Sequence, residues 1–324
     1  MIKTTCLINN FNYGDFIIEA VESALRQTVE FDEVIVVDDA STDNSVQKLK
    51  ETYAQNPKVK LIIKDKNEGQ LSSFNQGYSA SSGDIICFLD SDDIYQNNYL
   101  ESILKIYNLY QECDFLFCGY QKFKDLEASG SDKINQQQEG QVDILQYVRN
   151  RGCSAVFTLH TKRYIGAPTS TLSMRRKTAE KILPFPYVED WRIRADDCLV
   201  YGASLVGAIK FTLSLKLVQY RIHGRNNFAN KTQENAKERK EILAHYQRKL
   251  ALNRLFNLFA QQMNYLDKSE LTSLIPFEFK TIPKPDSKDF RGYLNLLWYS
   301  NLKIPNKVKS SLIMTKYMLS TRKS

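Results

Sequence analysis

Long apolar runs are missing from this sequence of 324 residues: no window approaches the ~18 uninterrupted apolar residues that a membrane-spanning helix needs. The six cysteines are scattered and form no C-x-x-C pair, so a structural zinc site is not expected. The N-terminus also lacks a signal-peptide layout and enters a strand pattern at once. We therefore expect reduced thiols in a cytoplasmic protein.

Glycine-rich phosphate loops are absent as well. No G-x-G-x-x-G follows the first predicted strand, and no G-x-x-x-x-G-K-[ST] occurs in the chain. These absences argue against a dinucleotide-binding fold and against a P-loop enzyme. If the protein binds a diphosphate, a metal ion held by carboxylates would have to take the place of the glycine cradle.

The formal net charge of +7 is unevenly distributed along the chain. Residues 231–324 carry 18 Lys and Arg against 8 Asp and Glu, whereas the first 230 residues carry 26 against 29. Because the body has no basic groove and no known nucleic-acid module, we expect no nucleic-acid partner. The basic tail has three interpretations: peripheral contact with anionic lipid at the inner face of a membrane, contact with an acidic acceptor, or a solvated helical surface.

Short apolar runs alternate with helical patterns in the first part of the chain. Strands are predicted at 4–9, 33–37, 59–63, 85–89 and 114–119, with helices between them, including one over 95–110. This alternation predicts an α/β fold with a mostly parallel central sheet flanked by helices. Beyond residue 231 the pattern is helical. We therefore divide the chain into a domain at 1–228 and a basic, mostly helical C-terminal extension at 229–324.

Polar clusters follow four of the predicted strands. They are Asn9–Asn12, Asp38–Asp43, Lys64–Gly69 and Asp90–Asp93. Parallel sheets bind ligands at the carboxyl ends of their strands, so the four clusters predict one site at one edge of the sheet.

The last of these clusters, Asp90-Ser91-Asp92-Asp93, has the composition of a metal site. Adjacent carboxylates repel, and Mg²⁺ or Mn²⁺ bound by one or two carboxylates plus substrate phosphates relieves that repulsion. The alternative is a turn followed by a helix N-cap, because Asp is favoured in both places. The convergence with the other three clusters favours the metal site.

The order of these motifs resembles that of the family 2 glycosyltransferases, which are inverting enzymes of the GT-A fold, over about residues 2–228. The resemblance is carried by Asn9-Asn10-Phe11-Asn12, Val36–Asp43, Asn67–Gly77, the DxD segment Leu89–Asp93, and Tyr220-Arg221-Ile222-His223. Two departures occur: the opening segment lacks the family's proline, and Phe74 stands where many members have an arginine.

The resemblance implies transfer of a sugar from a nucleoside-diphosphate-sugar, with a preference for uridine, to an acceptor hydroxyl in polysaccharide or glycoconjugate biosynthesis. The implied acceptor is a saccharide or a lipid-linked sugar. The implied donor-site residues are Asn10, Asn12, Asp38, Asp39, Asn67, Gly69, Asn75, Asp90 and Arg221. Asp39 would accept hydrogen bonds from the base or ribose, Asp38 would either do so or brace its loop, and Arg221 would pair with the diphosphate or with a structural carboxylate.

The same resemblance implies which residues bind the metal ion and which act as the general base. Asp92 is our first choice as a direct ligand of Mn²⁺ or Mg²⁺, with Asp90 sharing the ion or reaching the ribose, and with His223 completing the site. An inverting transfer is a single displacement and needs one general base. Asp196 and Asp197 open a predicted helix and are the candidates, and the sequence does not choose between them.

A non-catalytic alternative is a nucleotide-binding or scaffold protein that kept the GT-A fold. Such a protein is expected to lack some of the acidic residues that catalysis needs. Because Asp39, Asp90, Asp92, the Asp196-Asp197 pair and His223 occur together, the sequence favours an enzyme.

Overall fold

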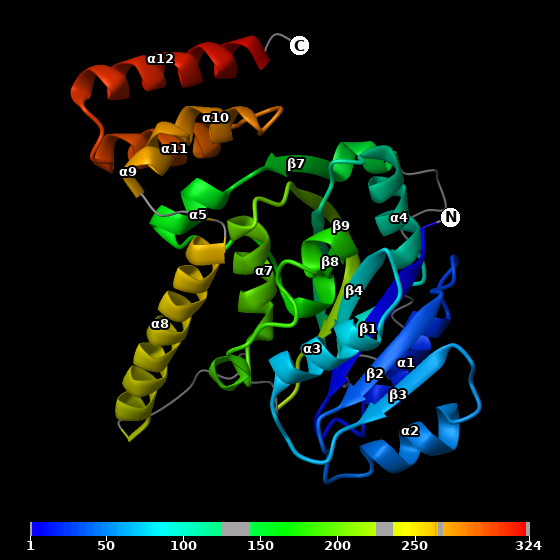
Figure 1. Cartoon of the computed structure of the whole chain (residues 1–324). Helices are drawn as coiled ribbons and strands as arrows, with labels where there is room; N and C mark the ends of the chain where they lie inside the picture. Colours follow the sequence, from blue (N-terminus) through cyan, green and yellow to red (C-terminus); the bar gives the residue numbers. More distant parts are fainter. Residues whose placement is uncertain (1, 125–142, 225–235, 263, 265–267, 322–324) are drawn as a thin grey trace.

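The computed structural model describes residues 2–124, 143–224, 236–262, 264 and 268–321. Its first half alternates strands and helices, as the apolar runs predicted (Figure 1). The elements are β1 Thr4–Asn10, α1 Ile17–Leu25, β2 Glu33–Asp38, α2 Ser45–Tyr53, β3 Val59–Ile63, α3 Gln70–Ala80, β4 Ile85–Asp90, β5 Ile94–Tyr95, α4 Tyr99–Leu109 and β6 Phe115–Phe123.

The second half contains shorter elements before it becomes helical. They are a 3₁₀ turn at Ile144–Tyr147, β7 Val148–Gly152, α5 Ala155–Thr161, a 3₁₀ turn at Thr169–Thr171, β8 Leu172–Arg175, α6 Arg176–Ala179, a 3₁₀ turn at Val188–Trp191, α7 Ala195–Leu205 and β9 Lys210–Arg221. The helices α8 Ala236–Gln262, α9 Lys268–Ser273, α10 Ile275–Lys280, α11 Ser287–Tyr299 and α12 Ile304–Thr321 follow.

The described strands form one nine-stranded sheet in the order β3-β2-β1-β4-β8-β6-β9-β5, with β7 also paired to β9. The strands β3, β2, β1 and β4 are parallel to one another. In contrast, β8 runs antiparallel to both β4 and β6. The expectation of a mostly parallel sheet therefore holds for β1–β4 and for the pair β6–β9, whereas β5, β7 and β8 pair antiparallel with their neighbours. Apolar periodicity reports burial and not strand direction.

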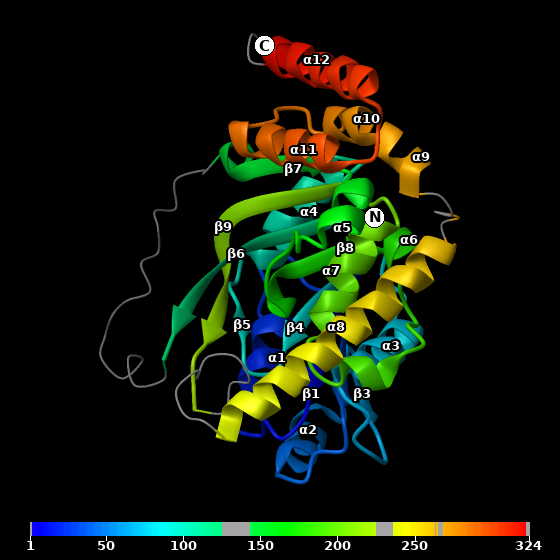
Figure 2. The ribbon, with the colours of Figure 1, turned by 90° about the vertical axis from the view of Figure 1, so that its left-hand side faces the viewer.

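Two hydrophobic cores cover the two faces of the sheet. One core joins apolar residues of α1, α2 and α4 to the strands, and includes Val21 and Ile103. The other joins α3, α7 and α8, and includes Phe74, Leu199 and Leu255. The long helix α8 thus packs into the same core as α7, as Figures 1 and 2 show from two directions.

The predicted strands agree with the structure within a few residues, and the exceptions arise from tertiary pairing. The helix expected over 95–110 begins at Tyr99, because Ile94 and Tyr95 instead pair with Gln219 and Val218 of β9. The sequence also predicts a strand over 167–174, but β8 begins only at Leu172.

The helical C-terminal extension expected from the sequence is present in the described residues. Helices α10, α11 and α12 share a third core with α5, which includes Phe157, Phe279, Leu297 and Met314. Within the described part of the chain, no helix is both long and apolar enough to cross a membrane.

Gly83 sets the contact between the central strands β1 and β4. A Cβ atom placed on it would lie 2.6 Å from the backbone nitrogen of Thr5, closer than atoms can approach. We expect Gly83→Ala to lower the free energy of unfolding by about 1–3 kcal/mol, because the two strands must separate. Denaturant unfolding measures this. A Cβ atom on Gly224 meets nothing within 4 Å, so Gly224→Ala is the matched control.

Candidate active site

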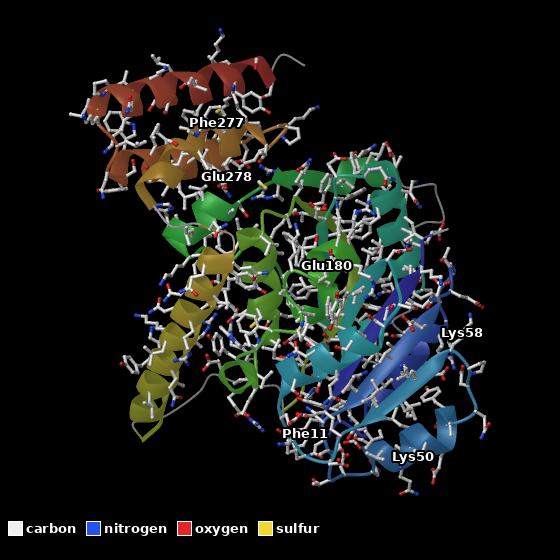
Figure 3. The ribbon with its side chains drawn as sticks, viewed as in Figure 1. Phe11, Lys50, Lys58, Glu180, Phe277 and Glu278 are labelled. Atoms are coloured by element: carbon white, nitrogen blue, oxygen red, sulfur yellow. The ribbon has the colours of Figure 1, made fainter. Side chains whose placement is uncertain are left out.

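One pocket lies where the carboxyl ends of β1, β2 and β4 face the segments before β8 and α7. It encloses about 780 Å³. Phe11, which follows β1 and lines the pocket, marks this edge of the molecule in Figure 3. The predicted site residues that line it are Asn10, Asp39, Asn67, Gly69, Asp90, Asp92 and Asp196. Asn12, Asp38, Asn75, Asp197, Arg221 and His223 are not among its lining residues.

Asp38 and Asn12 brace the loop that follows β2. Asp38 is fully buried and accepts hydrogen bonds from Asn10 Nδ2 (2.7 Å) and from the backbone nitrogen of Ser41 (2.8 Å). Asn12 has a left-handed backbone with φ of 59°. Its Oδ1 accepts from the backbone nitrogen of Thr42 at 2.8 Å. These contacts give both residues a structural part in holding the wall of the pocket.

Asp39 joins the loops after β2 and β3. Its carboxylate accepts from the backbone nitrogens of Glu68 (2.9 Å) and Gly69 (2.7 Å) and pairs with the buried ammonium of Lys64. Sequence reasoning did not single out Lys64. This ion pair lies at the pocket wall, where Asp39 is only 3% exposed.

Gly69 allows two loops to meet beside the pocket. Its φ is 91°, and a Cβ atom there would lie 2.4 Å from Cα of Arg192. Asn67 contacts the same arginine, because its carbonyl oxygen accepts from Arg192 Nη2 at 3.0 Å. Asn75 instead exchanges two hydrogen bonds with the backbone of Phe185, which fixes α3 to the segment before α7.

The three carboxylates at the end of β4 have different partners. Asp90 Oδ1 accepts from Gln70 Nε2 at 3.0 Å. Asp93 is buried and accepts from Ser170 Oγ (2.6 Å) and from the backbone nitrogen of Arg221 (2.9 Å). Burial, followed by the charges of Asp92 and Asp196, raises the pKa of Asp90 to about 8. Burial and the neighbouring carboxylates also raise the pKa of Asp93.

His223 and Arg221 lie behind Asp92, at the end of β9. Nε2 of His223 is 3.0 Å from Oδ2 of Asp92, and its ring stacks on Phe16 with centroids 4.9 Å apart. The guanidinium of Arg221 lies between the rings of Phe16 and Phe123, at 4.7 and 4.6 Å from their centroids.

The charge of Arg221 is already engaged by the protein. Its Nε donates to the backbone oxygen of Asp92 at 2.9 Å, and its Nη2 pairs with Glu19. Of the two roles considered for this arginine, these contacts correspond to pairing with a structural carboxylate.

In the described residues, no group of three or more His, Cys, Asp or Glu side chains could hold a metal ion by itself. Asp92 and His223 nevertheless form a close pair of ligand types that suit Mn²⁺. A protein that supplies one or two ligands and leaves the rest to substrate phosphates is the usual arrangement for Mg²⁺. The residues therefore fit an ion that binds together with a diphosphate.

The structure separates the two candidate bases. Asp197 is fully buried, and its carboxylate accepts two hydrogen bonds from Arg194 (3.0 and 3.1 Å) and two from Arg248 of α8 (3.1 and 2.9 Å). Asp196 lines the pocket, and its Oδ2 accepts from the hydroxyl of Tyr164 at 2.9 Å. Burial and the neighbouring Asp197 charge raise the pKa of Asp196.

Gln70 joins the two walls of the pocket, which sequence reasoning missed. Its Nε2 donates to Asp90, and its Oε1 accepts from the backbone nitrogen of Ala195 at 3.0 Å. One amide thus links the end of β4 to the first turn of α7, next to Asp196. Gln70 lies within the matched segment 67–77, but no spacing rule predicts that it reaches two elements.

Arg192, Arg194 and Tyr164 also line the pocket and were not singled out. Arg192 and Arg194 precede the carboxylate pair at 196–197, and this proximity was the available signal. Nothing in the sequence marks Arg248, because it approaches from α8, 51 residues after Asp197.

Comparison with known proteins identifies close resemblances. A family model described as glycosyl transferase family 2 matches residues 5–155. An uncharacterized glycosyltransferase of Nostoc sp. is 35% identical over 227 residues, covering 70% of this chain and 66% of that protein. Chondroitin synthase of Escherichia coli is 34% identical over 121 residues, covering 37% of this chain and 17% of that protein. The chain thus spans less than two thirds of these relatives.

A solved structure has a similar fold. The crystal structure of Staphylococcus aureus TarS 1–349 in complex with UDP-GlcNAc superposes with a TM-score of 0.53 at 16% identity, covering 99% of this chain and 92% of that chain. The same protein in complex with UDP gives a TM-score of 0.51 at 18% identity. At this identity the likeness concerns the fold, and it confirms the predicted fold class.

The two neighbouring carboxylates at the start of α7 should respond differently to neutralisation. We expect Asp197→Asn to lower the free energy of unfolding by about 3–5 kcal/mol, because two arginines would lose their buried counter-charge. Thermal or denaturant unfolding measures it. The control is Asp190→Asn, which removes a more exposed pair with Arg254 and should cost about 1 kcal/mol or less. Equal losses would contradict the assignment.

Proposed function

Because the chain belongs to glycosyltransferase family 2, which confirms the predicted enzyme class, we propose that it transfers a sugar from a uridine-diphosphate-sugar to an acceptor hydroxyl with inversion. The observation that carries this proposal is the single pocket that brings Asp39, the DxD carboxylates and Asp196 together. The fold likeness to a protein solved with UDP and with UDP-GlcNAc supports the choice of nucleotide.

The donor occupies the half of the pocket formed by the ends of β1, β2 and β4. Asp39 faces this half with its carboxylate fixed by the loop 68–69, and it accepts a hydrogen bond from the base or ribose. Asn10, at the end of β1, lines the same half of the pocket. Its Oδ1 is buried without a described hydrogen-bond partner. Asn67 and Gly69 form the side of the same half, and Asp90 lies at its floor.

Asp92 and His223 would hold the divalent ion, Mn²⁺ or Mg²⁺, with Asp90, which also lines the pocket, as a further carboxylate that could share it. When bound, the ion offsets the negative charge that develops on the leaving diphosphate. Stacking of His223 on Phe16 keeps the imidazole beside Asp92. Glu19 and the Phe16–Phe123 pair hold Arg221, which donates to the backbone of Asp92 and so positions the loop.

Asp196 acts as the general base. It lines the pocket, and the hydroxyl of Tyr164 orients its Oδ2. Asp197 is saturated by Arg194 and Arg248 and is therefore assigned to holding the first turn of α7. As the acceptor oxygen bonds to the anomeric carbon, its proton passes to Asp196, and the bond from that carbon to the diphosphate oxygen breaks on the opposite face.

The acceptor is a saccharide or a lipid-linked sugar, and the product belongs to a polysaccharide or glycoconjugate. The similarity of part of the chain to a protein named chondroitin synthase supports this class. We assign the donor and acceptor site to residues 1–228 and a supporting role to 229–324. We place the protein in the cytoplasm, where its six free cysteines would stay reduced.

Binding of uridine diphosphate tests the donor site. We expect calorimetry to detect binding that strengthens with Mn²⁺, and we expect Asp92→Ala to abolish the strengthening, because the bridge between protein and diphosphate is lost. The control is Glu112→Ala, which changes an exposed residue in the turn between α4 and β6 that does not line the pocket. Tight binding that is indifferent to both Mn²⁺ and Asp92 would instead support a non-catalytic nucleotide-binding protein.

Substitution of the proposed base tests the chemistry separately. We expect Asp196→Asn to reduce kcat by about 10²–10⁴-fold while uridine diphosphate still binds, because only proton transfer is lost. Since the base must be ionised and its pKa is raised, wild-type kcat should fall with decreasing pH at a higher pH than an ordinary aspartate would cause. Steady-state kinetics across pH measure both. A variant with unchanged kcat would rule out this assignment.

A further inference from the structure

Helix α12 has two apolar faces, and only one of them packs on the protein. Met314 and Met318 are buried against α10 and α11. On a different side, Ile304, Val308, Leu312 and Leu319 are 69, 44, 65 and 55% exposed. Their spacing of four, four and seven residues places them along one stripe of an α-helix. Packing on the body explains the first face and leaves the stripe unexplained.

Further large apolar side chains are exposed on the helices that support α12. Phe277 of α10 is 64% exposed, and Trp298 and Tyr299 lie exposed at the end of α11, just before α12 begins. Figure 3 labels Phe277 on α10, the helix that packs against α12. We call the stripe on α12 together with these three aromatic residues the C-terminal face. Tryptophan and tyrosine are the residues enriched where proteins meet the interface of a bilayer.

The net charge around the C-terminal face is positive. Residues 274–321 contain eight Lys and Arg and three acidic residues. All three acids are used within the protein. Glu278 accepts from the backbone nitrogens of Val156 (2.6 Å) and Phe157 (2.8 Å), and Asp286 and Asp289 pair with Arg149.

The basic side chains of the same segment are mostly exposed, and Nζ of Lys307 donates to the backbone oxygen of Trp298 at 2.8 Å. Among the described residues, none of the eight forms an ion pair with an acid; they are Lys280, Lys284, Lys288, Arg291, Lys303, Lys307, Lys309 and Lys316. Lys309 and Lys316 lie on α12 next to the apolar stripe by helical spacing. The segment therefore presents apolar groups and uncompensated positive charge together.

The C-terminal face lies at the opposite end of the molecule from the pocket. In Figures 1 and 2 helices α10–α12 lie beyond β7, while Phe11 marks the pocket edge at the other end in Figure 3. A partner bound to the C-terminal face would leave the pocket open.

We propose that the C-terminal face binds the surface of an anionic phospholipid bilayer. The apolar stripe enters the boundary between headgroups and acyl chains, the aromatic residues lie at headgroup level, and the lysines contact the anionic headgroups. A second copy of the chain is disfavoured as the occupant, because two such faces would bring like charges together. This surface requires no catalytic activity and is independent of the proposed reaction.

Vesicle sedimentation with the full chain tests the proposal. We expect the protein to pellet with vesicles of phosphatidylcholine mixed with phosphatidylglycerol, much less with phosphatidylcholine alone, and less as salt is added. Leu312→Gln, and separately the double change Lys309→Glu and Lys316→Glu, should each weaken binding. At about 1 kcal/mol for each lysine near an anionic surface, the double change should weaken it at least ~10-fold.

Matched controls change the same residue types elsewhere. Leu109→Gln on α4 replaces a leucine that is 54% exposed, and the double change Lys50→Glu and Lys105→Glu alters net charge equally; both should leave vesicle binding unchanged. Thermal unfolding should show that every variant is folded. Absence of vesicle binding by the wild type, or equal loss in the controls, would overturn the proposal. A dimer in light scattering that Leu312→Gln dissociates would overturn it in favour of a self-interface.

Discussion

Repulsion among carboxylates at one edge of the sheet is the constraint on which the rest of this site depends. The end of β4 and the first turn of α7 bring together Asp90, Asp92, Asp93, Asp196 and Asp197. The protein compensates those that face inward: Asp197 has two guanidinium groups, and Asp93 has a hydroxyl and a backbone N–H. Burial and neighbouring carboxylates raise the pKa of Asp90 and Asp196, which line the pocket, and also the pKa of Asp93.

Two neighbouring aspartates, Asp196 and Asp197, have different surroundings because only Asp197 is paired with arginines. Asp196 and Asp197 differ by one position on a helix, which turns their side chains about 100° apart. One carboxylate therefore points to the pocket and the other to the interior. The inward one fixes the turn from which the outward one projects, and the amide of Gln70 ties that turn to Asp90. One side chain thus connects the two walls of the pocket.

The sequence predicted the edge of the sheet at which the pocket lies. It could not distinguish residues that line the pocket from residues that hold the surrounding loops. The runs at 33–37, 59–63 and 85–89 predicted strands well, because strands buried on both faces carry a strong apolar signal. The polar ends of those strands predicted the edge of the sheet at which the pocket lies. However, Asn12, Asp38 and Asn75 hold loops and helices instead of lining the pocket, and composition alone does not tell an amide that binds ligand from one that binds backbone.

The sequence also could not predict which residues pair with these carboxylates, because the partners lie far away along the chain. Lys64, Gln70 and Arg248 act across 25, 20 and 51 residues of sequence, and no local period encodes such distances. The direction of β8 was likewise unpredictable, because it depends on where the chain re-enters the sheet.

The ion pair between Arg248 and Asp197 links the C-terminal extension to the domain at 1–228. A chain that stopped at residue 228 would keep every pocket-lining residue yet lose one of the two cations buried against Asp197. The surplus negative charge would then lie one residue from Asp196 and at the foot of the helix that presents it. Through Arg248, helix α8 therefore contributes to the charge balance at the start of α7, beside the pocket.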